Sequence, residues 1–455
     1  MKRFASILAL VCLSCFAATP ALAQGILRDA ETESLLNDMA RPLFEAAGLR
    51  PADTKVVLIG DPSINAFVAG GQIVYVHTGL LDAADTANEV QGVIAHEIGH
   101  ITGGHAVFNN DGGFGNISIL SLLLGAAAMA AGSPEAGMAV LGMGTRAAMG
   151  KYLAFSRVQE SSADAAGAGY LEKAGISGKG FLAFFDKLTK EMHRYGYYAT
   201  QNQPEIDPFS QTHPMSAARV ENLKSDVQKS AAWNKPSDPA IEARFKRVQA
   251  KLRGYVNEPK VTLQRYPLSD QSAAAHYARA YAYHKSGYPE QAAAETAALV
   301  KGAPEDPYFL ELEGQILLES GKPRESLEPL RQATARSNNQ PLIAATFGHA
   351  LLATDDKANL VEAETILRQA VARDKENPFA WMQLGTVYER KGDEPRTALA
   401  TAERAHLMGD ARVAMMSARA ALSALPQGSP DWVRAQDIMM VSQTTLDEEK
   451  RKKRN

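Results

Sequence analysis

Cysteine is almost missing from this sequence, and its scarcity limits both covalent cross-links and metal ligands. The 455-residue chain contains two cysteines, Cys12 and Cys15. Both lie within residues 1–23, which are predicted to be a cleaved signal peptide because a basic start and an apolar run precede small residues at positions 21 and 23. The mature chain would then contain neither disulfides nor thiolate ligands, so a metal ion would need nitrogen or oxygen ligands.

An excess of positive charge is also missing. Without the two basic residues of the leader, 46 basic residues remain against 51 acidic ones, which puts the mature net charge near −5. No region is basic enough to predict nucleic-acid binding, and the basic end of the tail at 446–455 directly follows acidic residues. We therefore expect an exported, periplasmic protein without a nucleic-acid partner.

Long hydrophobic runs are missing too. The most apolar stretch after the leader, 117–131, is shorter than the roughly 20 residues that a membrane-spanning helix needs. A segment rich in alanine, glycine and methionine follows at 136–150. The region 117–150 is predicted to form either a buried hairpin or a surface that touches the membrane or an unfolded substrate, and both alternatives stay open.

The most informative motif that is present is His96-Glu97-Ile98-Gly99-His100. Positions four residues apart lie on one face of a helix, so both imidazoles can reach one cation while Glu97 points to the water beside it. Apolar residues before the motif predict a buried helix with one polar face. The spacing therefore predicts a zinc peptidase site with His96 and His100 as ligands.

Such a site needs a third protein ligand, and two candidates follow the motif. His105 comes nine residues after His96, one fewer than in the metzincin motif, so we expect it at the helix end or behind a ligand. Glu160 and Asp164 are four residues apart and would share one face of another helix. Their small and apolar neighbours favour a buried helix, with Glu160 as a ligand and Asp164 orienting a ligating imidazole.

A further cluster occurs at 213–219, where His213 and Pro214 precede Arg219. Proline favours a helix start, which would leave His213 in the preceding loop. A lone loop histidine is usually structural. Beside a zinc site, His213 could instead stabilise an oxyanion or occupy the open position of the metal in a resting state.

Residues 72–77 alternate in the way that is typical of a β-strand. Such a strand could lie at a sheet edge and pair with an extended peptide, or it could be an ordinary internal strand. The alternation alone favours neither position.

Together these motifs resemble those of the HtpX and CAAX-prenyl-protease family of zinc metallopeptidases, and most closely its exported BepA-like members. The resemblance is carried by Asn65-Ala66-Phe67, HEIGH at 96–100, SRVQESSAD at 156–164 and HPMSAAR at 213–219. It implies a mainly α-helical HExxH peptidase domain of the gluzincin type with a small β-sheet, followed by helical repeats.

The resemblance also implies roles for individual residues. Zinc would be bound by His96, His100 and Glu160, with Asp164 supporting a ligand from behind. Glu97 would be the general base. The resemblance further implies that His213 is a resting-state ligand that holds the site inactive, and that Arg219 belongs to the catalytic site.

The C-terminal half shows a period of 34 residues, both from Gly287 to Gly321 and from Gly314 to Gly348. This is the length of a tetratricopeptide repeat, in which a small residue lets paired helices approach. We predict four helix pairs at about 273–410 and a capping pair to about 445, forming a protein-binding α-solenoid. The predicted domains are a signal peptide at 1–23, a zinc metallopeptidase domain at 24–225, a linker with a helix at 226–270, tetratricopeptide repeats at 271–445 and a charged tail at 446–455.

The favoured function is an exported zinc-dependent endopeptidase that hydrolyses misfolded or stalled envelope and outer-membrane proteins, which the repeats recruit. A switch at His213 would hold its activity off. The alternative is a chaperone-like assembly factor for outer-membrane proteins with weak or latent proteolysis, although the intact Glu97 favours the enzyme. The expected partners are misassembled envelope proteins, an outer-membrane assembly machine bound through the repeats, and the membrane surface, touched through 117–150.

Overall fold

The computed structural model describes residues 25–105, 145–199, 213 and 217–454. Its contacts divide the described residues into two compact units, one within 25–27 and 32–246 and the other formed by 28–31 and 247–454. The predicted signal peptide lies outside the described residues, as does 117–150 except for its last six positions. Within the described ranges, no helix is both long enough and apolar enough to cross a bilayer.

A small sheet in the first unit contains β1 (Lys55–Ile59), β2 (Ala66–Val68) and β3 (Ile73–His77), in the order β1-β3-β2. β3 pairs in parallel with β1 and antiparallel with β2. Gly70 and Gly71 turn the chain between β2 and β3 with positive φ angles of 64° and 103°, which glycine adopts without strain. The strand order makes the strand predicted at 72–77 internal, with β1 and β2 at the two edges of the sheet.

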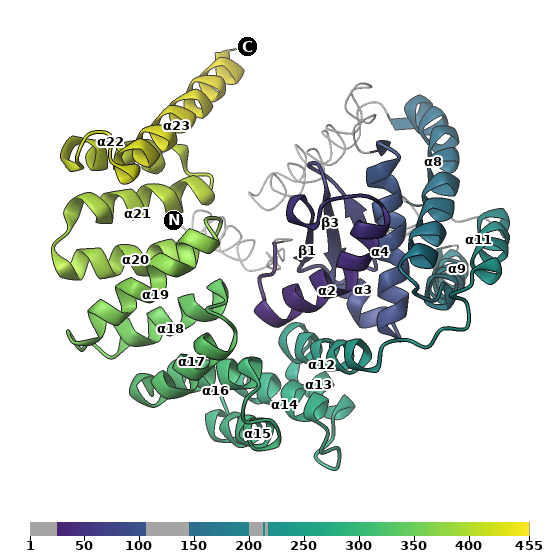
Figure 1. Cartoon of the computed structure of the whole chain (residues 1–455), viewed down its shortest axis with the longest axis horizontal. Coiled ribbons are helices and arrows are strands. Elements are labelled where there is room, and N and C mark those ends of the chain that lie inside the picture. The colour runs from purple at the N-terminus through teal and green to yellow at the C-terminus, as the bar shows by residue number, and fades with distance from the viewer. Residues whose placement is uncertain (1–24, 106–144, 200–212, 214–216, 455) are drawn as a thin grey trace, which may run out of the picture. The chain divides into compact units, whose positions relative to one another are not determined.

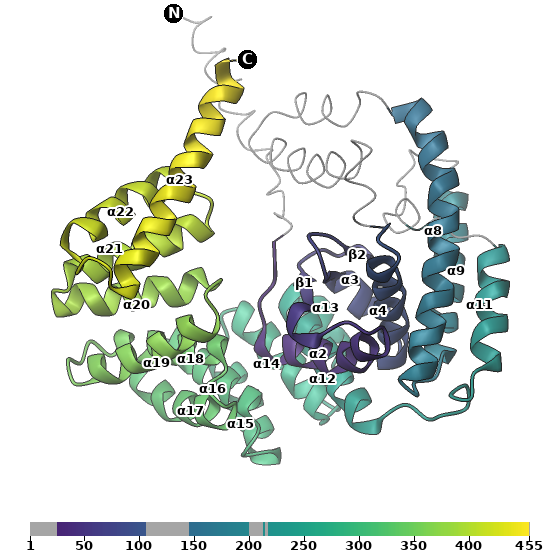
Figure 2. The same ribbon diagram turned by 45° about the horizontal axis from the view of Figure 1, so that its top comes forward.

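Helices form successive layers beside this sheet (Figure 2). α4 (Ala87–Thr102) packs on β2 and β3, and α8 (Thr145–Lys173) and α9 (Lys179–Ala199) pack on α4. α11 (Ala217–Lys229) then packs on α8 and α9. The unit also contains α3 (Thr78–Ala83), the short 3-10 helix η1 (Pro51–Asp53) and all but the first residues of α2 (Ala30–Ala46).

α4 is fixed at its start and buried along its length. The hydroxyl of Thr86 accepts a hydrogen bond from the backbone N–H of Glu89, and the Glu89 carboxylate accepts one from the backbone N–H of Asp85. Every residue from Ala87 to His100 except Gln91 is buried. The buried helix predicted from the apolar spacing before the motif is thus present, and neighbouring elements hold it on all sides.

The second unit consists mainly of stacked helix pairs, which Figure 1 shows in sequence order. α12 (Pro239–Val256) and α13 (Pro259–Arg265) lie within the predicted linker 226–270. The pairs that follow are α14 (Ala273–Lys285) with α15 (Pro289–Gly302), α16 (Pro307–Glu319) with α17 (Pro323–Arg336), α18 (Pro341–Ala353) with α19 (Asn359–Arg373), α20 (Pro378–Lys391) with α21 (Glu394–Leu407), and α22 (Ala411–Ala424) with α23 (Pro430–Arg454).

Two of the periodic glycines, Gly314 and Gly348, lie where paired helices touch, whereas Gly287 and Gly321 follow the ends of their helices with φ angles of 74° and 76°. A Cβ on Gly314 would be 2.4 Å from Cγ of Leu330, and one on Gly348 would be 2.5 Å from Cγ of Leu367. Any larger residue would therefore push the two helices apart. This contact is a physical reason for the 34-residue spacing of Gly314 and Gly348, and the predicted α-solenoid is confirmed.

Candidate metal centre

His96 and His100 lie on the same face of α4, one helical turn apart. Their Nε2 atoms are 3.1 Å apart, and the side chains are almost fully buried. The rings of Phe181 and Phe185 on α9 pack against the His96 imidazole at centroid distances of 6.1 and 6.0 Å. Both imidazoles therefore present one nitrogen to a common point inside the unit.

α8 brings Glu160 to that point because α8 and α4 are in backbone contact. Glu160 Oε2 lies 3.4 Å from Nε2 of His96, and Oε1 lies 3.2 Å from Nε2 of His100. Gly99 permits this approach, since a Cβ at that position would lie 2.7 Å from the carbonyl oxygen of Ala163. The close contact between Gly99 and Ala163, about one turn along α8 from Glu160, thus lets the Glu160 carboxylate reach both histidines.

The donor set matches a catalytic zinc site. His96, His100, Glu160 and His213 offer ligand atoms that all lie within 4.8 Å of one another. Two imidazole nitrogens and one carboxylate oxygen are a common protein ligand set for zinc in hydrolases, and they leave a coordination position for a reactant. The residues present therefore fit the metal that the resemblance implies.

Glu97 lies beside this ligand set and is fully buried. Neither of its carboxylate oxygens has a hydrogen-bond partner among the described residues, and the Nε2 atom of His213 lies 3.6 Å from Oε1. A buried carboxylate of this kind is costly, so it is expected only where a polar reactant binds. This property distinguishes Glu97 from Glu160, which has several partners.

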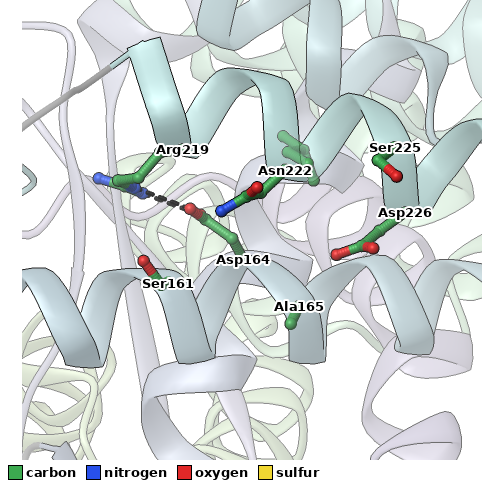
Figure 3. A pocket seen from close by; sticks show the side chains of 8 residues that line it. Ser161, Asp164, Ala165, Arg219, Asn222, Ser225 and Asp226 are labelled. Carbon is green, nitrogen blue, oxygen red and sulfur yellow. Dashed lines mark hydrogen bonds and ion pairs between the residues drawn. The ribbon is translucent and has the colours of Figure 1, made fainter.

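Asp164 and Arg219 support the ligands from behind. Oδ1 of Asp164 lies 3.0 Å from Nδ1 of His96, the nitrogen that faces away from the ligand set. Arg219, on α11, donates two hydrogen bonds of 2.7 and 2.8 Å to Asp164 and lies 2.9 Å from Glu160. Figure 3 shows the Arg219 side chain directed at Asp164 from the facing helix. Both residues line a polar cavity of about 210 Å³. These contacts suit a positioning role for both residues.

Burial and charge shift the pKa values of this cluster strongly. Burial lowers the pKa of His96, but hydrogen bonds to Asp164 and Glu160 outweigh it and raise that pKa to about 10. Burial raises the pKa of Glu160, but the charge of His213 and hydrogen bonds from the imidazoles hold it well below its usual value. For Asp164 the hydrogen bond from Arg219 likewise outweighs burial and lowers the pKa. Both carboxylates are therefore ionised, and a metal ion that binds here must displace a proton from His96.

The sequence of residues 27–227 matches the model of peptidase family M48. Residues 27–227 belong to family M48. This assignment makes the chain a metalloendopeptidase, and the HExxH motif with its buried Glu97 lies at the centre of the M48 domain.

Several known proteins are similar to this chain, and one of them matches well beyond residues 27–227. The beta-barrel assembly-enhancing protease of Escherichia coli (strain K12) is 25% identical over 405 residues, which cover 86% of this chain and 79% of that protein. Metalloprotease LoiP of the same strain is 28% identical over 201 residues, or 43% of this chain and 71% of LoiP. Among solved structures, the tetratricopeptide protein YrrB covers 39% of this chain and 92% of its own, with 19% identity and a TM-score of 0.32.

His213 enters the M48 site from a different part of the chain. Its Nδ1 atom lies 3.2 Å from both carboxylate oxygens of Glu160 and 3.3 Å from Nε2 of His96. Its Nε2 atom lies 3.3 Å from the carbonyl oxygen of Ala66 on the edge strand β2. Because a carbonyl oxygen can only accept, Nε2 carries a proton and Nδ1 is the atom that faces the ligand set.

His105 lies outside the ligand set of the M48 site. Its Nδ1 atom is 2.8 Å from Nδ1 of His100, on the far side of that imidazole from Glu160. Burial lowers the pKa of His105 to about 4. The residue is therefore neutral near pH 7 and lies behind a predicted ligand, where the sequence analysis expected it.

Two functional positions were missed by the sequence analysis. Gly99 was treated only as part of the motif, yet it sets the distance between the helices that carry the ligands. Ala66 was recognised only as part of a matching motif, and its backbone oxygen contacts His213. Gly99 could have been recognised because it lies on the helix face opposite Glu97, where a glycine permits close packing. Ala66 could not, because its contact is made by a backbone oxygen, which any residue type would provide.

Proposed function

We propose that this chain is an exported zinc endopeptidase of the periplasm, with His96, His100 and Glu160 as zinc ligands. The observation that carries the proposal is the convergence of these three side chains next to the buried, unpartnered carboxylate of Glu97. A structural zinc site would not need a buried carboxylate such as that of Glu97 beside its ligands.

Each residue then has a chemical role in peptide hydrolysis. Zinc, when bound, polarises the scissile carbonyl and makes a water molecule acidic. Glu97 takes a proton from the attacking water and passes it to the amine that leaves. Asp164 holds the His96 imidazole in orientation, and Arg219 in turn holds Asp164.

His213 is proposed to keep this site inactive at rest. Its Nδ1 atom faces the zinc ligands, while its Nε2–H group uses the carbonyl oxygen of Ala66 at the sheet edge. An extended substrate that adds to β2 would need the same carbonyl oxygen for its own backbone N–H. His213 therefore competes with substrate at two points, the metal and the strand edge.

The repeats are proposed to bring proteins to the M48 domain. Stacked helix pairs present an extended surface that is typical of protein recognition. The similarity to a beta-barrel assembly-enhancing protease over most of both chains supports misassembled outer-membrane proteins as substrates. An assembly machine bound through the repeats, and membrane contact through 117–150, belong to the same proposal.

A second function is favoured by the position of His213. If His213 blocks the site most of the time, the chain would act mainly as a chaperone-like assembly factor with latent proteolysis. The two functions differ in whether a client protein is cut after it binds.

A Glu97→Gln variant tests the catalytic assignment. It should bind zinc with wild-type stoichiometry because Glu97 is not a ligand, but it should not cleave casein or an unfolded outer-membrane protein. Cross-linking the variant to bound proteins in intact cells would identify its clients. Wild-type cleavage rates in the pure variant would remove Glu97 from the mechanism, and wild-type protein without zinc would contradict the proposed site.

A His213→Ala variant tests the switch. Removing the imidazole frees the metal-facing position and the Ala66 carbonyl oxygen, so proteolysis of casein should rise. His406→Ala, which removes a histidine from α21 in the repeats, is the matched control and should leave the rate unchanged. A fall in the rate of His213→Ala with full zinc content would mean that His213 assists catalysis instead.

A further inference from the structure

The Nδ1 atom of His100, which faces away from the ligand set, contacts a residue that has no role in the proposed reaction. Nε2 of His100 faces the ligand set, 3.2 Å from Glu160, so Nδ1 points to the opposite side. There it meets Nδ1 of His105 at 2.8 Å, and the two rings lie edge to face with centroids 4.9 Å apart. This is a hydrogen-bond distance between two nitrogens that cannot both be donors or both be acceptors.

Metal binding decides which nitrogen donates. An imidazole that binds a cation through Nε2 carries its remaining proton on Nδ1, so Nδ1–H of His100 is the donor. Nδ1 of His105 must then accept, which leaves the proton of His105 on its own Nε2. We propose that His105 is a positioning residue that fixes the tautomer and the ring orientation of His100, an inference that rests on the proposed zinc site.

The backbone next to His105 is shaped for this contact. A Cβ on Gly103 would lie 2.5 Å from Nε2 of His105 and 2.7 Å from its Cε1 atom, so the imidazole lies directly against the bare Cα of that glycine. Gly104 has a φ angle of 67°, which other residues adopt only with strain. Two successive glycines therefore let the chain leave α4 and fold the His105 ring back under His100.

The two ligating histidines are thus held by different kinds of acceptor. The carboxylate of Asp164 stands behind His96, whereas a neutral imidazole stands behind His100. The site already buries the carboxylates of Glu97, Glu160 and Asp164. A neutral acceptor orients the second histidine without adding a fourth buried negative charge, which would have to be desolvated.

Two substitutions of His105 test the proposal by distinguishing its role as a hydrogen-bond acceptor from its role as a packed ring. His105→Asn can place an acceptor oxygen near the position of Nδ1, whereas His105→Phe keeps a ring without any acceptor. Zinc affinity is measured by competition with a chelator on the full-length mature protein. Loss of an outer hydrogen bond of this kind typically weakens metal binding about 10–100-fold, so we expect that loss for His105→Phe and near wild-type affinity for His105→Asn.

The Gly103→Ala variant tests the same proposal independently, without changing His105 itself. The added methyl group must displace the imidazole of His105 without changing any polar group, so its zinc affinity should fall toward that of His105→Phe. Equal zinc affinity for wild type, His105→Phe and Gly103→Ala would overturn the proposal, as would equal losses for His105→Phe and His105→Asn. A wild-type protein that binds zinc but cleaves no peptide would contradict the proposed function and leave the role of His105 intact.

Discussion

Adding a single methyl group at Gly99 should disrupt the metal centre without touching any ligand. In Gly99→Ala the new Cβ would lie 2.7 Å from the carbonyl oxygen of Ala163 and 2.8 Å from its Cα. These are backbone atoms of α8, so no side chain can rotate to make room. Restoring an ordinary contact of 3.4 Å requires α4 and α8 to separate by about 0.7 Å.

This separation is large on the scale of metal coordination. Glu160 lies on α8 and His96 and His100 lie on α4, so the carboxylate moves away from the imidazoles together with its helix. Zinc sites tolerate deviations of only about 0.2 Å in ligand distances. We expect zinc affinity to fall by at least tenfold, and overpacking should reduce the free energy of unfolding by about 1–3 kcal/mol.

The measurements are zinc competition with a chelator, casein cleavage, and thermal unfolding of the metal-free protein. A loss of this size corresponds to a fall in Tm of roughly 2–12 °C for a domain of this length. Gly169→Ala is the matched control because it lies on α8 with no atom within 4 Å of the added Cβ. The control should be as stable as the wild type or slightly more stable, since alanine favours a helix over glycine by about 0.5–1 kcal/mol. Wild-type zinc affinity in Gly99→Ala would refute the reasoning.

Three further predictions concern the support of the site, its protons and the repeats. Arg219→Lys keeps a charge but loses the paired hydrogen bonds to Asp164, so kcat/KM should fall about tenfold or more with the fold intact by circular dichroism. Zinc affinity should rise as pH increases from 6 to 8, because His96 without metal has a pKa of about 10 and so holds a proton that zinc must displace. Calorimetry in buffers of different ionisation enthalpy should detect the released proton. An affinity that does not change with pH would contradict this prediction. Gly348→Ala should lower the free energy of unfolding of the repeats by about 1–3 kcal/mol in denaturant titrations because its Cβ meets Leu367, whereas Gly302→Ala, with open space around it, should not.

The local geometry of the site could be predicted from the sequence because helical spacing is regular. Positions four apart on a helix must share a face, and this placed His96 beside His100 and Glu160 beside Asp164. The sequence analysis also expected Glu160 to act as a ligand and Asp164 to orient a ligating imidazole, and the structure places the two carboxylates on opposite sides of the His96 ring. That division depends on the depth at which α8 packs on α4, which Gly99 determines.

The parts that could not be predicted depend on tertiary contacts. His213 is 117 residues from His96 in the chain, and no periodicity links them, so only the family resemblance indicated their proximity. The position of β3 inside the sheet was left open because alternation reports which face of a strand is buried. It carries no information about whether the strand has one neighbour or two.

Charge balance links the protons of this buried site to the binding of a metal ion. Three buried carboxylates face one guanidinium, that of Arg219, and the remaining negative charge raises the pKa values of His96 and His213. Protons on these two imidazoles therefore supply the missing positive charge. A divalent cation supplies the same charge at the same place, so metal binding exchanges protons for a metal ion with little change in the electrostatics of the surrounding protein.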